Sequence, residues 1–131
     1  MPASEYTAHL IADAVANGTA YQGPATVYLA LTKTVPTKTV AGTAFTSGGV
    51  GRKTWAQSGW TNDGTGNLEN TAMIEWAAAS ADFEDEVLAV EAYDAATNGN
   101  RLWWVELSSP KTIVDDMVPT VLTGDLQLAV V

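Results

Sequence analysis

His9 is the only histidine of the chain, and Asp13 follows it one helical turn later. A histidine beside a carboxylate can act as a general base, but it needs a positioned nucleophile whose proton it removes. The chain has no cysteine and no Gly-x-Ser-x-Gly elbow that would present a serine. We therefore expect His9 to be an ordinary residue at the surface or boundary of a helix, and we expect the protein not to be an enzyme.

Acidic side chains gather in the run Asp82-Phe83-Glu84-Asp85-Glu86, which could attract Ca²⁺. A calcium loop places its oxygen ligands at ordered spacings and has a glycine at its turn, and this run matches neither requirement. We therefore interpret it as a solvated acidic turn and predict no metal or other cofactor. Asp94, Asn98 and Asn100 are interpreted as side chains that organise a turn by hydrogen bonding to the backbone.

Glycines and basic residues combine in Gly48-Gly49-Val50-Gly51-Arg52-Lys53, which superficially matches a phosphate-binding loop. Such a loop requires Gly-Lys-Ser/Thr at the start of a helix, whereas the residues that follow here have the pattern of a strand. Fifteen acidic against six basic residues give a formal net charge of −9, which repels nucleic acids and anionic membranes. We expect the protein to bind no nucleotide, no nucleic acid and no membrane.

Aromatic residues are the strongest candidates for a binding surface. Trp103 and Trp104 are adjacent, and adjacent residues of a strand point to opposite faces of the sheet. One tryptophan can therefore enter the core, and its neighbour should face outward, to solvent, to the predicted helix or to another subunit. The same argument applies to Tyr28, and exposed aromatic residues are enriched at protein interfaces. The alternative is a carbohydrate-binding platform built from Trp60, Trp103 or Trp104.

Two segments of regular structure stand out among the elements that must position these residues. Strands are predicted at Val87–Tyr93 and Arg101–Leu107, and the Asn-Gly pair between them favours a hairpin loop. A helix is predicted at about residues 4–17, with Ser4 as its N-cap and Asn17-Gly18 as its stop. We expect its apolar face to pack on the domain's own sheet, and the alternative is that it docks on a partner. The residues of this face are Tyr6, Leu10, Ile11, Ala14 and Val15.

The rest of the chain alternates short apolar segments with turn residues. About eight strands against one helix predict a mainly β protein, an antiparallel β-sandwich with one N-terminal helix. The further strands are expected at Ala25–Thr32, Arg52–Gln57, Asn70–Ala77, Lys111–Val114, Val121–Thr123 and Leu126–Val130, and Trp60–Asn67 is expected to be turn-like. A length of 131 residues predicts a single domain, residues 1–131. The absence of cysteine and of a signal peptide fits folding in a reducing cytoplasm.

A long surface loop is predicted at about residues 33–51, because the segment is rich in Thr, Gly and Pro and has no core-forming pattern. Basic residues concentrate around it, namely Lys33, Lys38, Arg52 and Lys53. We expect this loop to contact a neighbouring acidic surface and to become ordered on assembly. Val50, Arg52 and Lys53 therefore join Tyr28, Trp103 and Trp104 as interface candidates.

The order of these segments resembles that of a family of small virion proteins of tailed phages, described as tail-fibre-like, minor tail or head decoration proteins. The strongest shared pieces are Asp94-Ala95-Ala96-Thr97 with its Asn-Gly turn, and Pro110-Lys111-Thr112 downstream. Val50 departs from the family pattern, which has a tyrosine at this place. The other matching segments are Asn17–Tyr21, Pro24–Leu31, Thr34–Thr37, Gly48–Arg52, Ala81–Phe83 and Pro119–Leu126.

The resemblance implies a structural role in the virion and supplies no catalytic residues. We expect a head decoration or minor capsid protein, because a compact acidic chain without a shaft repeat or a coiled coil suits a subunit added in many copies. The alternatives are a small tail or baseplate protein and, from another class, a carbohydrate-binding module. The expected partners are the major capsid protein or neighbouring virion proteins and further copies of the chain, with a trimer favoured. We expect the protein to fold in the host cytoplasm before it joins the virion.

Overall fold

The computed structural model describes residues 3–20, 23–62 and 67–128. Helix α1 (Glu5–Ala16) begins after Ser4, whose side chain accepts a hydrogen bond from the Thr7 amide, and it ends at Asn17. Gly18 follows with φ +65°, a conformation that costs glycine little. The helix and both of its caps are therefore confirmed as predicted.

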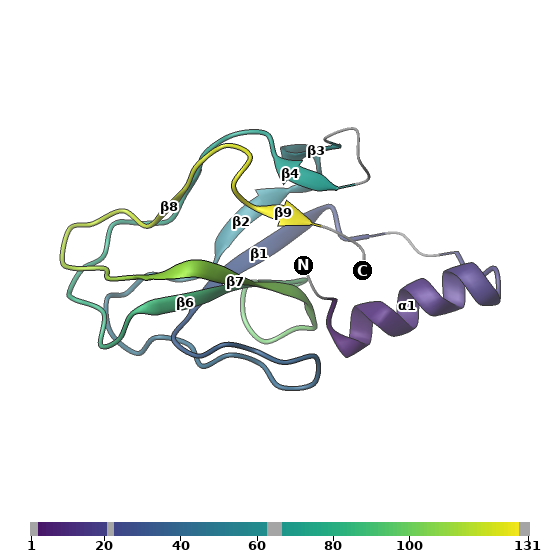
Figure 1. Ribbon diagram of the computed structural model, residues 1–131, viewed down its shortest axis with the longest axis horizontal. Helices are drawn as coiled ribbons and strands as arrows, with labels where there is room; N and C mark the ends of the chain where they lie inside the picture. Colours follow the sequence, from purple (N-terminus) through teal and green to yellow (C-terminus); the bar gives the residue numbers. More distant parts are fainter. Residues whose placement is uncertain (1–2, 21–22, 63–66, 129–131) are drawn as a thin grey trace.

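A four-stranded antiparallel sheet with the strand order β2-β1-β6-β7 forms the body of the protein (Figure 1). One side of the sheet is the predicted hairpin of β6 and β7, in which Asn98 and Gly99 have positive φ in the connecting loop. The strand β7 extends past the residues predicted for it and lies at one edge of the sheet. The four strands are β1 (Thr26–Thr32), β2 (Lys53–Ala56), β6 (Val87–Tyr93) and β7 (Arg101–Lys111).

Two smaller antiparallel sheets, of order β3-β4-β9 and β5-β8, cover one face of this sheet. The main core lies between the layers, where Val27, Leu29 and Val90 of the large sheet pack with Ile74 and Leu126 of the opposite layer. The protein is therefore mainly antiparallel β with one N-terminal helix, as the sequence predicted. The smaller elements are β3 (Trp60–Asn62), β4 (Leu68–Asn70), β5 (Ile74–Glu75), β8 (Thr120–Val121), β9 (Gln127–Leu128) and a 3₁₀ turn at Gln57–Gly59.

Four sequence predictions about these elements are wrong or fall outside the described residues. Lys111–Val114 is not a strand of its own, because β7 ends at Lys111 and residues 112–114 are in no strand. Trp60–Asn62 is a strand rather than a turn, because it pairs with β4. The strand predicted at Asn70–Ala77 is divided, because Asn70 pairs with β3 while Ile74 pairs with β8. Val130, the last residue predicted for the final strand, lies outside the described residues.

Helix α1 does not pack on the sheet, which contradicts the prediction for its apolar face. No residue of α1 is buried, and Val15 is 82% exposed. The helix is joined to the body where it begins, because the Ser4 amide donates to the Leu102 carbonyl and the Glu5 amide donates to the Lys38 carbonyl. From this point it runs away from the sheet (Figure 1).

Gly48 is a buried glycine of the loop at residues 33–51, where the sequence predicted only surface. Its φ is +85°, and a Cβ added to it would lie 2.3 Å from the Phe83 ring. Phe83 belongs to a second core cluster with Ala79, Val87 and Ile113. The backbone of the loop at Gly48 therefore packs directly against the Phe83 ring of this second core cluster.

We expect Gly48→Ala to lower the free energy of unfolding by about 2–4 kcal/mol, because the methyl group overlaps the Phe83 ring and the positive φ is strained. Gly51→Ala is the matched control, since no atom lies within 4 Å of its added Cβ. Urea denaturation of both variants measures the difference. Equal stabilities would show that Phe83 moves aside without cost.

Candidate functional site

A buried ion pair lies on the face of the large sheet opposite the main core. The Arg101 guanidinium donates to the Glu91 carboxylate at 3.1 Å, and their side chains are 9% and 1% exposed. The same carboxylate accepts hydrogen bonds from the Gly42 amide at 3.0 Å and from the Tyr93 hydroxyl at 3.1 Å. A buried charge is tolerated when it is paired and hydrogen-bonded in this way.

Arg101 also fastens the loop at residues 33–51 to the sheet. Its guanidinium donates to the carbonyls of Thr37, Lys38 and Val40, and it lies over the Trp104 ring with 5.0 Å to the ring centroid. Figure 1 shows the loop on the side of the sheet away from β3, β4 and β9. The loop thus has fixed partners within its own chain, whereas the sequence predicted that it becomes ordered on assembly.

The ion pair of Glu91 and Arg101 was not predicted, although the sequence contains a signal for it. Glu91 interrupts the apolar strand β6, and Arg101 opens the aromatic strand β7. Charged residues are almost never fully buried unless they are paired. A glutamate in an apolar strand and an arginine at the start of the next strand therefore indicate an ion pair across a hairpin.

Arg52 and Tyr93 continue the network toward the hairpin loop. The Arg52 guanidinium lies 3.7 Å from the centroid of the Tyr93 ring and donates to the carbonyls of Ala95 and Asn98 at 2.7 and 2.8 Å. Burial and then the Glu91 carboxylate raise the pKa of Tyr93, although Arg52 and Arg101 partly oppose this rise. The phenol therefore stays neutral at physiological pH and can donate to Glu91.

Asp94 organises the hairpin loop as the sequence predicted. Its carboxylate accepts from the Asn100 amide at 2.7 Å and from the Asn100 side chain at 3.0 Å. The two Arg52 contacts hold the same loop from outside it. The residue types of the segment 94–100, which carries the strongest family resemblance, are therefore explained by the hydrogen bonds that shape this loop.

Trp103 and Trp104 are both buried, at 7% and 8% exposed, which contradicts the prediction that one of them faces outward. The alternation of faces is as expected, since Trp103 enters the main core and packs edge-on against Trp60. Trp104 lies on the other face with Glu91, where the Arg101 side chain covers it. The Arg101 side chain, which is held by the loop carbonyls, therefore covers the tryptophan that local alternation leaves outside the core.

The remaining interface candidates are distributed over β1, β2 and the loop before β2. Tyr28 is half-buried on the face opposite the core, where it pairs with Tyr93 of β6. Val50 is half-buried and packs against both core clusters. Lys53 is half-buried and lies opposite Leu29 in the pairing of β1 with β2. Tyr28 and Arg52 thus both lie next to Tyr93, whereas Val50 packs against the core.

The acidic turn at residues 82–86 is a structural anchor rather than a freely solvated turn. The Glu84 carboxylate accepts from the Ser47 hydroxyl, from the Thr46 and Ser47 amides at 2.7 and 2.9 Å, and from the Lys33 ammonium at 3.1 Å. The Ser47 hydroxyl and then the Thr46 amide hold the pKa of Glu84 far below its ordinary value of 4.5. Lys33 is therefore engaged within the chain. Among the described residues, no group of three or more His, Cys, Asp or Glu side chains could hold a metal ion.

The low pKa of Glu84 predicts the pH dependence of stability. A carboxyl group whose pKa is lower in the folded state stabilises the fold above its unfolded pKa, and this contribution is lost as the pH falls. We expect the wild type to lose more stability than Glu84→Gln between about pH 5 and pH 2. Urea midpoints at several pH values measure this. Parallel pH profiles would show that the Glu84 contacts add nothing.

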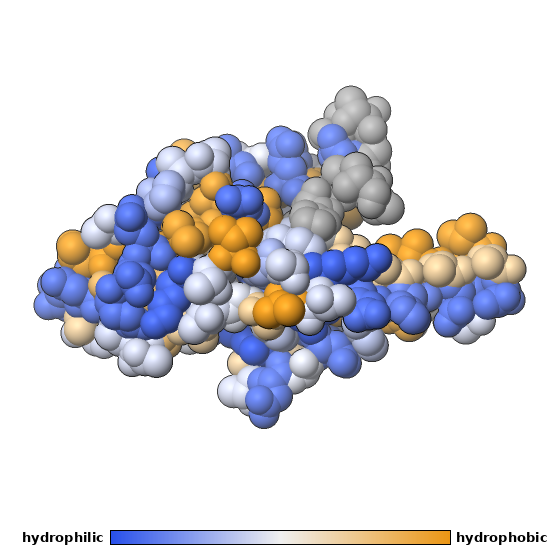
Figure 2. Space-filling model, turned by 60° about the horizontal axis from the view of Figure 1, so that its bottom comes forward, coloured by the Kyte–Doolittle hydropathy of each residue, from blue (hydrophilic) through white to orange (hydrophobic). Residues whose placement is uncertain are grey.

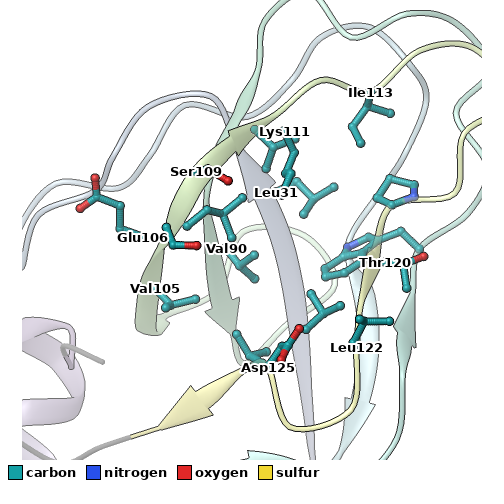
Figure 3. Close-up of a pocket in the computed structure, with 17 residues that line it drawn as sticks. Leu31, Val90, Val105, Glu106, Ser109, Lys111, Ile113, Thr120, Leu122 and Asp125 are labelled. Carbon is teal, nitrogen blue, oxygen red and sulfur yellow. The ribbon is translucent and has the colours of Figure 1, made fainter.

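An open apolar groove of about 600 Å³ lies between the large sheet and the layer that covers it. Leu31, Val90 and Val105 line it from the sheet, and Leu122 lies across from them (Figure 3). Polar and charged residues also line it, among them Glu106, Lys111 and Asp125 (Figure 3). The two layers of the sandwich are therefore not closed along the second half of β7.

The apolar face of α1 is a further exposed apolar surface. Tyr6 and Val15 are 42% and 82% exposed, and Leu10, Ile11 and Ala14 are only partly covered. Figure 2 shows apolar residues along one side of the projecting helix and hydrophilic residues along the other. Among the described residues, no helix has the length and apolar character to cross a membrane.

These features describe a β-rich protein in which Glu84, Glu91 and Arg101 hold its own loops and in which the apolar side of the helix and the groove are open. A family model described as podophage GP4 fiber I protein gp80 matches residues 2–129. Because this match covers nearly the whole chain, the protein belongs to this family of phage fibre proteins. It is a phage virion structural protein, and the family implies a location in the virion, as the resemblance suggested. No curated protein matches the chain.

Proposed function

We propose that the protein is a non-catalytic structural subunit of a phage tail fibre or of the adjoining tail. The observation that carries this proposal is the match to a fibre family over residues 2–129. This match favours a location in the tail over head decoration. Head decoration was the expectation from the compact acidic chain. The fixed hydrogen bonds of Glu84, Glu91 and Arg101 suit a rigid subunit, because they hold long loops against the sheet.

The carbohydrate-binding alternative loses its main support. A stacking platform requires exposed aromatic faces, and all five tryptophans lie among the described residues with none in the exposed class. Trp60 is half-buried and its ring is committed to Trp103, with 5.8 Å between the centroids. A structural role uses the same residues without an exposed platform, because they fill the core.

The partners we propose are neighbouring virion proteins and further copies of the chain, with a trimer favoured. The exposed apolar side chains support this, since they include Val15 of the helix and Leu122 at the groove. Surfaces of this kind mark contacts between proteins when they are contiguous. The strongly acidic composition keeps the unassembled subunit soluble.

Labelled electron microscopy of intact virions tests the location. An antibody or a gold label on an affinity tag should mark the tail or its fibres, at a constant number of sites for each particle. Uniform labelling of the head would overturn the proposal and restore head decoration. A glycan array with the purified protein is the companion experiment, and specific binding there would restore the carbohydrate alternative.

A further inference from the structure

Helix α1 and the open groove are at opposite ends of β7. The helix is joined to β7 near its first residues, because the Ser4 amide donates to the Leu102 carbonyl at 2.9 Å. The groove is lined by the second half of the same strand, from Val105 to Lys111. Since the helix runs away from this end of the sheet (Figure 1), it does not reach the groove of its own chain.

The two surfaces match in chemistry and in scale. The helix presents Tyr6, Leu10, Ile11 and Val15 on one side at helical spacing. An amphipathic helix docks in an apolar groove by inserting side chains at such positions. The groove of about 600 Å³ takes a row of apolar side chains while the helix backbone stays outside it.

The accessible surface of the single chain is larger than that of a compact protein of its mass. Its accessible surface is 7303 Å², whereas a compact monomer of 13.8 kDa exposes about 6600 Å². The excess is about 700 Å². A helix that projects without a buried residue accounts for such an excess.

We propose that α1 of one copy docks its apolar face in the groove of a second copy. The inference rests on the proposed function, in which copies of the chain stand side by side in the virion. The contact is head-to-tail, because helix and groove are different surfaces, and such contacts close into a ring or continue as a filament. Each copy then contributes one helix and one groove.

The absence of cysteine allows a direct test with the full chain. Val15→Cys and Leu122→Cys are made in separate chains that carry tags of different size, and the two are mixed under a mild oxidant. Both positions are exposed in the single chain, so the fold should survive. We expect the mixed disulfide between the two variants to exceed both homodimers, because only the mixed pair is brought together.

Val40→Cys replaces Val15→Cys in the control mixture, since Val40 is 62% exposed on a different surface. A mixed disulfide no stronger than in this control overturns the proposal. A dominant Val15→Cys homodimer also overturns it, in favour of helix-to-helix packing. As a second measurement, Val15→Glu should weaken self-association of the purified protein on the order of tenfold in sedimentation, while Val40→Glu should not.

These measurements use purified protein without virions. Failure of the docking therefore leaves the proposed location in the tail untouched. Conversely, labelling of the head would overturn that location without affecting the result of the cross-linking.

Discussion

Arg101→Ala should lower the free energy of unfolding by about 3–5 kcal/mol, because it leaves the carboxylate of Glu91 buried without its counter-charge. The side chain of Glu91 is 1% exposed, so water does not replace the lost partner. The substitution also removes the donors to the Thr37, Lys38 and Val40 carbonyls. Urea denaturation measures the loss, and hydrogen exchange should show faster exchange of the amide at Gly42, which donates to Glu91.

The double variant Glu91→Ala/Arg101→Ala should lose less than the sum of the two single losses, because it removes both charges together. Lys33→Ala is the matched control. Its ion pair with Glu84 has side chains that are 21% and 25% exposed, and we expect a loss below about 1 kcal/mol. A similarly small loss for Arg101→Ala would show that water enters the Glu91 site, and it would falsify the account of the network as an anchor of the loop.

Asn70→Leu should be nearly as damaging, with an expected loss of about 3–5 kcal/mol. Asn70 is fully buried, and its amide donates to the Ala72 and Leu122 carbonyls at 2.8 and 3.0 Å. Its side-chain oxygen accepts from the Leu126 amide at 2.9 Å. Leucine has a similar size but leaves the buried Leu126 amide and two partly buried carbonyls, those of Ala72 and Leu122, without this partner. A buried group left unpaired costs about 1–3 kcal/mol.

Asn17→Leu is the control for this change, since Asn17 is exposed and donates one side-chain hydrogen bond at 3.2 Å, to Asp13. We expect that variant to lose less than about 1 kcal/mol. Thermal unfolding followed by circular dichroism ranks the two variants. Equal midpoints would mean that the segment before β9 does not depend on Asn70 for its position.

Both substitutions act where segments distant in sequence meet. Glu91 and Arg101 hold the loop at residues 33–51, and Asn70 holds the segment that leads into β9. Each site satisfies backbone groups of an irregular segment with a buried polar side chain. Such segments have no partner strand along much of their length, so side chains must satisfy their backbone groups instead.

Local patterns were sufficient to predict the elements with short-range causes. The caps of α1 follow from Ser4 and from Asn17-Gly18, because capping depends on the residues next to a helix end. The hairpin of β6 and β7 follows from apolar strands around an Asn-Gly pair, because positive φ is favoured there. The resemblance likewise led to the virion class, because its motifs extend along most of the chain.

Only the tertiary structure decided what covers each face and edge. Alternation placed Trp103 and Trp104 on opposite faces, but burial of Trp104 depends on Arg101 and on a loop some 60 residues earlier in the chain. The spacing of apolar residues in α1 predicted an apolar face, yet whether that face meets the chain's own sheet depends on the direction in which Ser4 starts the helix. Periodicity depends on neighbouring residues, whereas the burial of a face depends on which distant segments pack against it. The sequence alone therefore determined the β-rich class and the virion family, and the tertiary structure decided which surfaces remain open.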